Sequence, residues 1–214
     1  MSLTPQLVVM AKRPLLGAVK TRLAKGIGAV AAAKFYRQTT LDLLRRIDGD
    51  PRWQTLLALS PDRAVHDDGV WPQGLPRVAQ GQGDLGARMG RLMRDLPPGP
   101  VVIIGSDIPD ISRRHIADAF ERLGTADAVF GSSEDGGYWL VGLRRRPRIV
   151  EIFGEVRWSS EYALADTRRN VEASGLSIAT LETLRDIDTG GDYERWRRER
   201  QPALMRKPPD GRFR

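Results

Sequence analysis

An uninterrupted apolar run near the middle of the chain constrains the fold more than any other feature. Residues Val101-Val102-Ile103-Ile104 are all β-branched, and a glycine follows them. Such a run favours a strand that is buried on both faces, as in the centre of a parallel sheet. A parallel sheet needs helices on both of its faces, so the run predicts an α/β protein.

Further strands and helices are expected to alternate along the rest of the chain. Shorter apolar runs predict strands at Leu7–Ala11, Thr55–Leu59, Ala128–Gly131 and Tyr138–Leu143. Helical spacing of apolar residues predicts helices at about 29–47, 85–96, 112–123 and 159–173, and a short basic helix at about Gly191–Arg200. The alternation predicts a three-layer αβα fold with a mostly parallel sheet, which binds ligands at the carboxyl ends of its strands.

Length and composition favour one domain without thiol chemistry. We expect a single domain over residues 1–196 and a basic, flexible tail at 197–214. The absence of cysteine excludes disulfides and thiolate metal sites. No apolar run reaches membrane-spanning length and no secretory signal pattern is present, so we expect a cytoplasmic protein. Residues 195–214 hold eight basic and two acidic side chains, and we expect this end to aid solubility rather than to bind nucleic acid.

A basic glycine loop follows the first predicted strand. The first 41 residues carry seven Lys or Arg side chains and no acidic one, and Lys12 and Lys20 frame a loop that contains Gly17. Backbone N–H groups of such a loop and of the next helix N-terminus can face phosphate oxygens, while the cations neutralise their charge. The loop therefore predicts a polyphosphate ligand, although the P-loop spacing is absent.

Two aspartates are candidates for metal binding. Asp107 directly follows the predicted central strand, beside the expected phosphate site, where a carboxylate can hold Mg²⁺ or Mn²⁺. We favour this role for Asp107 over a turn-forming one. Asp188 lies before the last predicted helix and is either a second metal ligand or a helix cap. The residues alone leave these two roles of Asp188 open.

Three other polar segments have both a structural and a functional interpretation. The glycines of Gln80–Arg88 suit either a turn before a helix or a loop close to a nucleobase, with polar contacts from Asp84 or Arg88. The acids and glycines of Ser132–Trp139 suit an acceptor pocket, but alone they would indicate a β-hairpin turn. Trp158-Ser159 has the ordinary interpretation of a partly buried ring before a helix cap.

Taken together, these segments resemble one protein family. In order along the chain stand MAKRPLLGAVKTRLAKGIG, QGQGDLGARM, VVIIGSDIPDI, VFGSSEDGGYWLVGL, EVRWSS and LRDIDTGGDYERW. Over about Leu7–Trp196 they resemble the radical-SAM/selenodomain-associated transferase 1 family, which implies a GT-A-like fold of the nucleotide-diphospho-sugar transferase superfamily. The first loop and the general layout are also similar to those of 2-phospholactate and molybdenum-cofactor guanylyltransferases. Trp139 is a departure, because relatives often have tyrosine there.

The resemblance implies that Lys12, Lys20 and Arg22 bind phosphate, that Asp107 and Asp188 bind the metal, that Gly83, Asp84 and Gly86 approach the base, and that Glu134, Asp135 and Tyr138 face the acceptor. Together with the motifs described above, it implies a role for each residue of the expected site. The implied phosphate-binding and nucleotide-binding residues are Lys12, Gly17, Lys20, Thr21, Arg22, Gly83, Asp84 and Gly86. The implied acceptor-binding residues are Gly136, Gly137, Tyr138, Trp158 and Ser159. The implied catalytic residues are Lys20, Asp107, Glu134 and Asp135, and the implied metal ligands are Asp107 and Asp188. The metal would be Mg²⁺ or Mn²⁺.

The expected function is that of a metal-dependent transferase that uses a nucleotide. The dense cationic loop favours nucleotidyl transfer from an NTP to a small phosphorylated or hydroxylated acceptor, because a leaving pyrophosphate needs charge neutralisation. The alternative is glycosyl transfer from an NDP-sugar, with Glu134 or Asp135 as general base. A further alternative is a nucleotide-binding protein without turnover. The sequence leaves the base, the acceptor and the oligomeric state open.

Overall fold

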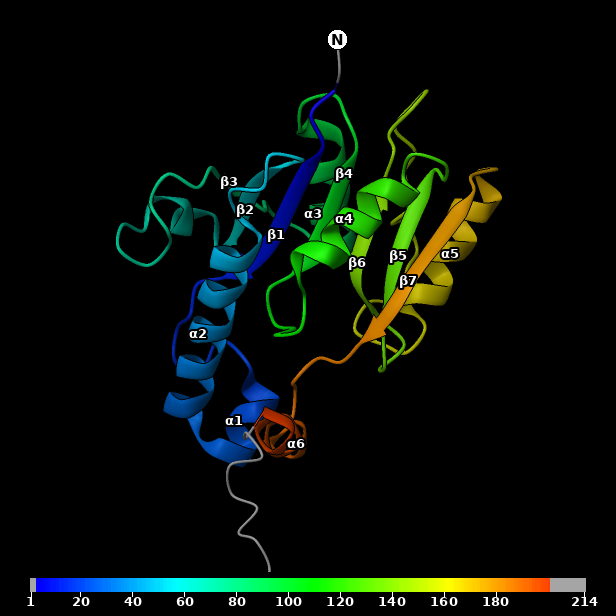
Figure 1. Ribbon diagram of the computed structural model, residues 1–214. Coiled ribbons are helices and arrows are strands. Elements are labelled where there is room, and N and C mark those ends of the chain that lie inside the picture. The colour runs from blue at the N-terminus through cyan, green and yellow to red at the C-terminus, as the bar shows by residue number, and fades with distance from the viewer. Residues whose placement is uncertain (1–2, 201–214) are drawn as a thin grey trace, which may run out of the picture.

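The computed structural model describes residues 3–200. The strands in this range form one seven-stranded sheet (Figure 1). The strands are β1 (Gln6–Lys12), β2 (Gln54–Ser60), β3 (Arg77–Ala79), β4 (Val101–Gly105), β5 (Ala128–Ser133), β6 (Tyr138–Leu143) and β7 (Ile178–Leu184). Their order is β3-β2-β1-β4-β6-β5-β7, and only β6 pairs antiparallel with both of its neighbours. The predicted mostly parallel sheet is therefore confirmed.

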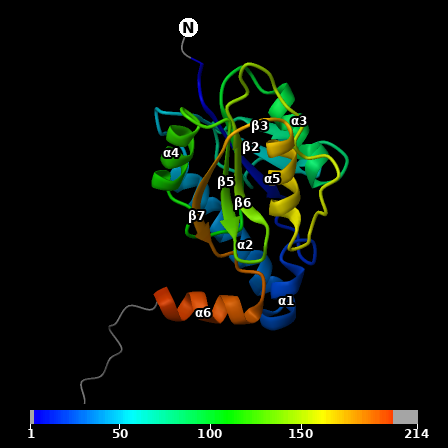
Figure 2. The same cartoon turned by 90° about the vertical axis from the view of Figure 1, so that its right-hand side faces the viewer.

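Helices cover both faces of the sheet (Figure 2). They are α1 (Thr21–Ile27), α2 (Ala29–Ile47), α3 (Leu85–Asp95), α4 (Arg113–Arg122), α5 (Ala163–Ala173) and α6 (Gly190–Arg200). Side chains alternate along β1, so Leu7 and Val9 join the core under α2 and α4, whereas Val8 joins the core under α3 and α5. The two cores, one on each face, confirm the predicted three-layer αβα fold.

Strand β4 lies in the interior of the sheet, as its apolar run predicts. The side chains of Val101–Ile104 are at most 2% exposed, and β4 lies between β1 and β6. Parallel pairing with β1 aligns Met10 with Gly105, so the two strands end side by side. The loops that follow β1 and β4 therefore leave the sheet together, and this brings the basic loop next to Asp107.

Strand β7 and helix α1 escaped the sequence-based prediction. Strand β7 lies at one edge of the sheet, and Leu181 is its only fully buried residue, so its hydrophobic pattern is weak. Helix α1 has seven residues and contains Gly26, which hides the helical pattern.

Helix α5 begins at Ala163 instead of about residue 159, because Ser159 has a left-handed backbone conformation with φ of 59°.

Helices α1 and α6 lie beyond the carboxyl ends of the parallel strands (Figure 1). Leu23 of α1, Phe35 of α2, and Tyr193 and Trp196 of α6 form a small apolar cluster that joins the three helices. The rings of Tyr193 and Trp196 meet the edge of Phe35 at centroid distances of 5.2 and 5.3 Å. Helix α6 is thus held by helices α1 and α2 and not by the sheet.

The carboxyl-terminal end of the described region bears on two predictions. Helix α6 runs to Arg200, so its last residues overlap the tail predicted at 197–214, and the rest of that tail lies outside the described residues. The division into a domain and a flexible tail stays a prediction. No helix among residues 3–200 combines the length and the apolar character needed to cross a bilayer.

The contact between α1 and α6 predicts the effect of a methyl group at Gly26. A Cβ atom there would lie 2.8 Å from Cα of Gly190, a backbone atom that cannot rotate away. Helix propensity favours Gly26→Ala by up to about 1 kcal/mol, but overpacking costs about 1–3 kcal/mol. We expect lower stability in urea unfolding and faster amide hydrogen exchange in α6. Gly154→Ala is the control, because its new Cβ meets nothing within 4 Å. A more stable Gly26→Ala variant would contradict the packing argument.

Candidate active site

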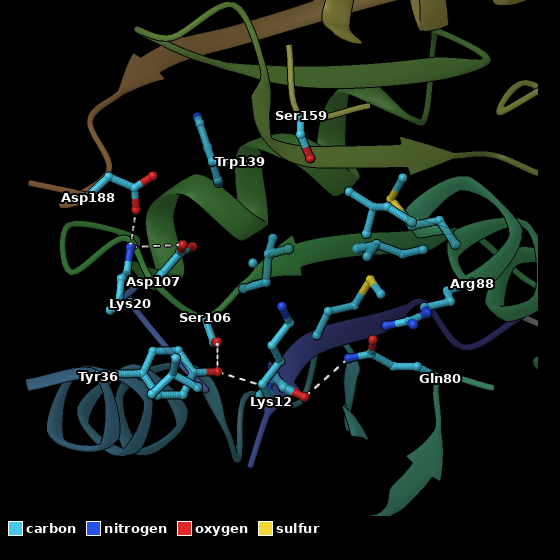
Figure 3. A pocket seen from close by; sticks show the side chains of 18 of the residues that line it. Lys12, Lys20, Tyr36, Gln80, Arg88, Ser106, Asp107, Trp139, Ser159 and Asp188 are labelled. Atoms are coloured by element: carbon cyan, nitrogen blue, oxygen red, sulfur yellow. Dashed lines mark hydrogen bonds and ion pairs between the residues drawn. The ribbon is translucent and has the colours of Figure 1, made fainter. Parts of the chain in front are cut away.

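A buried lysine joins three loops at the carboxyl ends of the strands (Figure 3). Lys20 ends the loop after β1, Asp107 follows β4, and Asp188 lies between β7 and α6. The Nζ atom of Lys20 is 3.0 Å from Oδ2 of Asp107 and 2.6 Å from Oδ1 of Asp188. The Lys20 side chain is only 6% exposed, so its charge is balanced mainly by these two carboxylates.

The backbone of Lys20 is held in an unusual conformation. Lys20 has φ of 47° and ψ of 46°, in the left-handed region that residues other than glycine rarely adopt. This geometry turns the chain into α1 while its side chain points at Asp107 and Asp188. Burial acts to lower the pKa of Lys20, but the two carboxylates outweigh it and the pKa is raised. The side chain is therefore positively charged at neutral pH.

A third carboxyl group adds negative charge beside the ion pairs. Burial, followed by the charges of Asp188 and Asp135, raises the pKa of Asp186 to about 6. Lys20 opposes this shift and Asp107 adds to it. The region beside Lys20 is therefore rich in carboxyl groups.

The two carboxylates paired with Lys20 fit a divalent cation. Their oxygen atoms converge on one positively charged atom, and carboxylate oxygens are the ligands that Mg²⁺ and Mn²⁺ prefer. Within residues 3–200, no group of three or more His, Cys, Asp or Glu side chains forms a preassembled metal site. Asp107 and Asp188 could thus hold a cation whose remaining ligands come from water or from a bound phosphate.

A buried tyrosine joins the first loop to the Asp107 loop. The hydroxyl of Tyr36 accepts a hydrogen bond from the backbone N–H of Lys12 at 2.8 Å and bonds Oγ of Ser106 at 3.1 Å. Thr40, one turn further along α2, donates to the carbonyl of Ser106. Burial raises the pKa of Tyr36, so the hydroxyl is neutral and keeps its proton. Helix α2 thereby sets the spacing between the two loops.

A glutamine lies at the other end of the site. The Nε2 group of Gln80 donates to the carbonyls of Ala11 and Ala58 at 3.1 and 2.9 Å. The opposite amide orientation would place oxygen against two carbonyl oxygens, so Oε1 must be the free end. No residue between 3 and 200 donates a hydrogen bond to Oε1, and Gln80 lines the pocket beside Arg88 (Figure 3).

One pocket of about 740 Å³ contains both ends. Its volume is within the usual range for small-molecule sites. The structure brings to it most of the residues proposed from the sequence: Lys12, Lys20, Thr21, Arg22, Gly83, Asp84, Asp107, Tyr138, Ser159 and Asp188. Trp139 also lines it, across from Lys12 and Gln80 (Figure 3). The roles of Gln80, Tyr36 and Ser106 were not predicted from the sequence, because they depend on buried hydrogen bonds that only the structure shows.

The proposed acceptor segment forms a hairpin turn between β5 and β6. Glu134, Asp135, Gly136 and Gly137 belong to this turn and do not line the pocket, although Tyr138, which follows them, does. Asp135 accepts the N–H of Gly137, and Glu134 lies 3.6 Å from Arg185. These contacts match the structural interpretation of the segment, and its acceptor role stays a prediction.

Three more proposed residues lie outside the pocket lining. Gly17, Gly86 and Trp158 are absent from it. A Cβ atom at Gly86 would lie 2.7 Å from Cζ2 of Trp158, so this glycine allows the ring to pack against α3. Asp84 does line the pocket, but its side chain also caps α3 by accepting the N–H of Ala87 at 2.8 Å. The glycine segment thus has a structural role in addition to its place at the pocket.

Comparison with known proteins agrees with this arrangement. The family described as "Uncharacterized protein conserved in bacteria (DUF2064)" matches residues 43–160, more than half of the chain. The chain belongs to this family. No curated protein is significantly similar to it in sequence. The narrower transferase family inferred from the motifs stays a prediction.

Solved structures extend the comparison to nearly the whole chain. A "putative nucleotide-diphospho-sugar transferase" from Desulfovibrio desulfuricans G20 is 28% identical, with a TM-score of 0.83 over 95% of this chain and 91% of its own. A CMP:2-keto-3-deoxy-manno-octonic acid synthetase complexed with CTP is 11% identical, with a TM-score of 0.58 over 92% and 98%. Rv0371c from Mycobacterium tuberculosis, complexed with manganese, is 17% identical, with a TM-score of 0.53 over 91% and 98%. The chain therefore shares its fold with these proteins and with a solved nucleotidyl transferase.

The Tyr36 hydrogen bonds predict a measurable loss on removing one oxygen atom. Tyr36→Phe leaves the N–H of Lys12 and the hydroxyl of Ser106 without their partner, which costs about 1–3 kcal/mol for buried groups. We expect this loss in the free energy of unfolding, measured with urea. Tyr162→Phe is the control, because its exposed ring keeps the cation–π contact with Arg157. Equal effects of the two substitutions would show that the hydrogen bonds of Tyr36 are unimportant.

Proposed function

We propose that this protein is a metal-dependent nucleotidyltransferase that binds an NTP in the 740 Å³ pocket. The observation that carries the proposal is the meeting of Lys20 with Asp107 and Asp188 at the carboxyl ends of the strands. A lysine and a pair of carboxylates suit a polyphosphate together with a divalent cation. The fold shared with nucleotidyltransferases, one of them complexed with CTP, supports the same assignment.

In the proposed complex the two ends of the pocket bind different parts of the nucleotide. Lys12, Lys20 and Arg22 bind the phosphates, because they are the cations at the end formed by the first loop. Gln80 and Arg88 face the base, with Oε1 of Gln80 as a fixed acceptor for a ring or amino N–H. Gly83 allows the backbone to lie close to the ligand.

Transfer requires an acceptor in line with the α-phosphorus. Tyr138, Trp139 and Ser159 line the pocket and are proposed to contact this small acceptor. Trp139 and Ser159 lie across from Lys12 (Figure 3). A phosphate oxygen of the acceptor, or a hydroxyl oxygen that gives its proton to solvent, attacks the α-phosphorus. The bond from the α-phosphorus to the oxygen that bridges to the β-phosphorus breaks, and pyrophosphate leaves. Lys20 and Arg22 neutralise the charge that builds on the leaving group, so positioning and electrostatics account for the catalysis.

A divalent cation fits the carboxylates of Asp107 and Asp188. Mg²⁺ or Mn²⁺ bound there would neutralise phosphate charge and polarise the bond to the leaving group. The manganese complex of Rv0371c, a protein of the same fold, supports this choice of ion.

Glycosyl transfer from an NDP-sugar is the second candidate. It is favoured by the description of the Desulfovibrio protein, which covers 95% of this chain. The same phosphate-binding and metal-binding residues would then hold a diphosphate leaving group. Two products distinguish the reactions, because nucleotidyl transfer releases pyrophosphate and glycosyl transfer releases a nucleoside diphosphate.

Thermal denaturation tests the proposed nucleotide site. The four common NTPs and a set of NDP-sugars are each added with Mg²⁺, Mn²⁺ or EDTA to the wild type and to Asp107→Asn. A ligand at 100 times its Kd stabilises the folded state by about 2.7 kcal/mol. We expect a metal-dependent rise in Tm with one NTP that Asp107→Asn abolishes. A rise with NDP-sugars alone would select glycosyl transfer, and no rise with any nucleotide would refute both reactions.

The two-ended pocket predicts different effects of two substitutions on ligand affinity. Gln80→Met removes the acceptor that faces the base, so NTP affinity should fall about 5-fold to 150-fold, as for a loss of 1–3 kcal/mol, while inorganic triphosphate binds as before. Lys20→Met should weaken both ligands, because each needs the phosphate-binding cation. Isothermal titration measures the four affinities. Equal losses of NTP and inorganic triphosphate in Gln80→Met would contradict the proposed orientation.

A further inference from the structure

The ammonium group of Lys20 occupies the position toward which both proposed metal ligands point. Its Nζ atom lies 2.6 Å from an Asp188 oxygen and 3.0 Å from an Asp107 oxygen. Both atoms are at hydrogen-bond distance, so the lysine already satisfies one oxygen of each carboxylate. A divalent cation that uses the same two oxygen atoms must displace this ammonium group.

Electrostatics makes this competition strong. The Lys20 side chain is 6% exposed, whereas those of Asp107 and Asp188 are 41% and 33% exposed. Water can therefore reach the carboxylates but hardly screens the lysine. A divalent cation placed between the same oxygen atoms would lie within a few ångströms of a like charge, which opposes its binding.

The first loop offers no equally good cation to take over this place. Arg22 approaches Asp188 only to 3.8 Å, and its side chain is 72% exposed, so the contact is weak. Lys12 lines the same pocket, but no ion pair joins it to a carboxylate of residues 3–200. Lys20 is thus the cation whose removal should change the affinity of the carboxylates for metal.

We propose that Lys20 is an internal counter-ion that keeps divalent cations off Asp107 and Asp188 until a nucleotide binds. The inference rests on the proposed function, since the phosphates of the nucleotide are the competing partner. When they enter the pocket, the ammonium group leaves the carboxylates and pairs with phosphate oxygens. The freed carboxylates and the phosphates then supply oxygen ligands together, so metal and nucleotide bind as a unit.

The proposal makes Lys20 serve two successive partners. It pairs with the carboxylates in the free protein and with phosphates in the complex, so Lys20 has a partner of opposite charge in both states. The left-handed backbone of Lys20 and its position at the start of α1 place the side chain within reach of both. A short change in side-chain direction accomplishes the switch, without movement of the sheet.

Binding of Mn²⁺ alone tests the proposal without nucleotide and without activity. Free Mn²⁺ is measured by electron paramagnetic resonance during titration of the wild type, Lys20→Met and Lys12→Met. We expect Lys20→Met, which keeps the length of the side chain and loses its charge, to bind Mn²⁺ at least about tenfold more tightly than the wild type. Lys12→Met removes one charge from the same pocket but should change the affinity less than threefold.

Further variants test whether the gain in Mn²⁺ affinity depends on the carboxylates. In Lys20→Met the gain in Mn²⁺ affinity should disappear when Asp107→Asn is added. If circular dichroism shows that the apolar side chain of Lys20→Met impairs folding, Lys20→Gln is used in its place. Equal Mn²⁺ affinity of the wild type and both Lys20 variants overturns the proposal, as does an equal gain in Lys12→Met.

The titration separates this proposal from the proposed function. If the wild type binds an NTP but the Lys20 variants bind Mn²⁺ no more tightly than the wild type, the nucleotide site stands. That result overturns only the inference that Lys20 is a counter-ion switch. A gain in Lys20→Met, in a protein whose Tm no nucleotide changes, supports the competition between lysine and metal and refutes the nucleotide site.

Discussion

The two ion pairs of Lys20 join segments that are far apart in the chain. Asp107 is 87 residues away from Lys20 and Asp188 is 168 residues away, yet both reach the same nitrogen atom. A lysine that is 6% exposed needs compensating charge, and Asp107 and Asp188 supply it. Burial raises the pKa of the neighbouring Asp186, and the negative charges of Asp188 and Asp107 add to this shift. The loops after β1, β4 and β7 therefore depend on one another through a single charge.

The rest of the structure holds these loops in place. Tyr36 fixes the first loop against Ser106, and the next residue is Asp107. On the other side, the close approach of Gly26 and Gly190 joins α1, which begins after Lys20, to α6, which begins after Asp188. The two supports are independent of the sheet hydrogen bonds. Together they explain how α6, which lies beyond the sheet, helps to hold the loops of the site in place.

The fold was largely predictable because hydrophobic patterns are local. The run Val101–Ile104 indicated the central strand, and amphipathic spacing indicated α2, α3 and α4 with bounds that differ from the structure by at most one residue. The pattern failed at β7, whose edge position requires little burial, and at α1, whose length is under two full turns. Elements that bury little apolar surface leave little signal in the sequence.

Most residues of the candidate site were predictable from the sequence, but their contacts with one another were not. The types of residue in the basic loop and after β4 predict phosphate binding at Lys20 and metal binding at Asp107, and these roles stay predictions. The structure adds the contact between the two side chains. The hairpin residues Glu134 and Asp135 have the same types of side chain but point to other partners. Composition cannot tell these cases apart, because the direction of a side chain depends on the turn that carries it.

By itself the sequence determined the layered fold, the strand ends at which a ligand site would form, and the cationic character of the first loop. Those features follow from side-chain types and their local spacing. Only the tertiary structure decided that Lys20 pairs with both Asp107 and Asp188, and that the amide of Gln80 presents its oxygen to the pocket. Both depend on atoms brought together from distant segments, and packing across the sheet sets those distances.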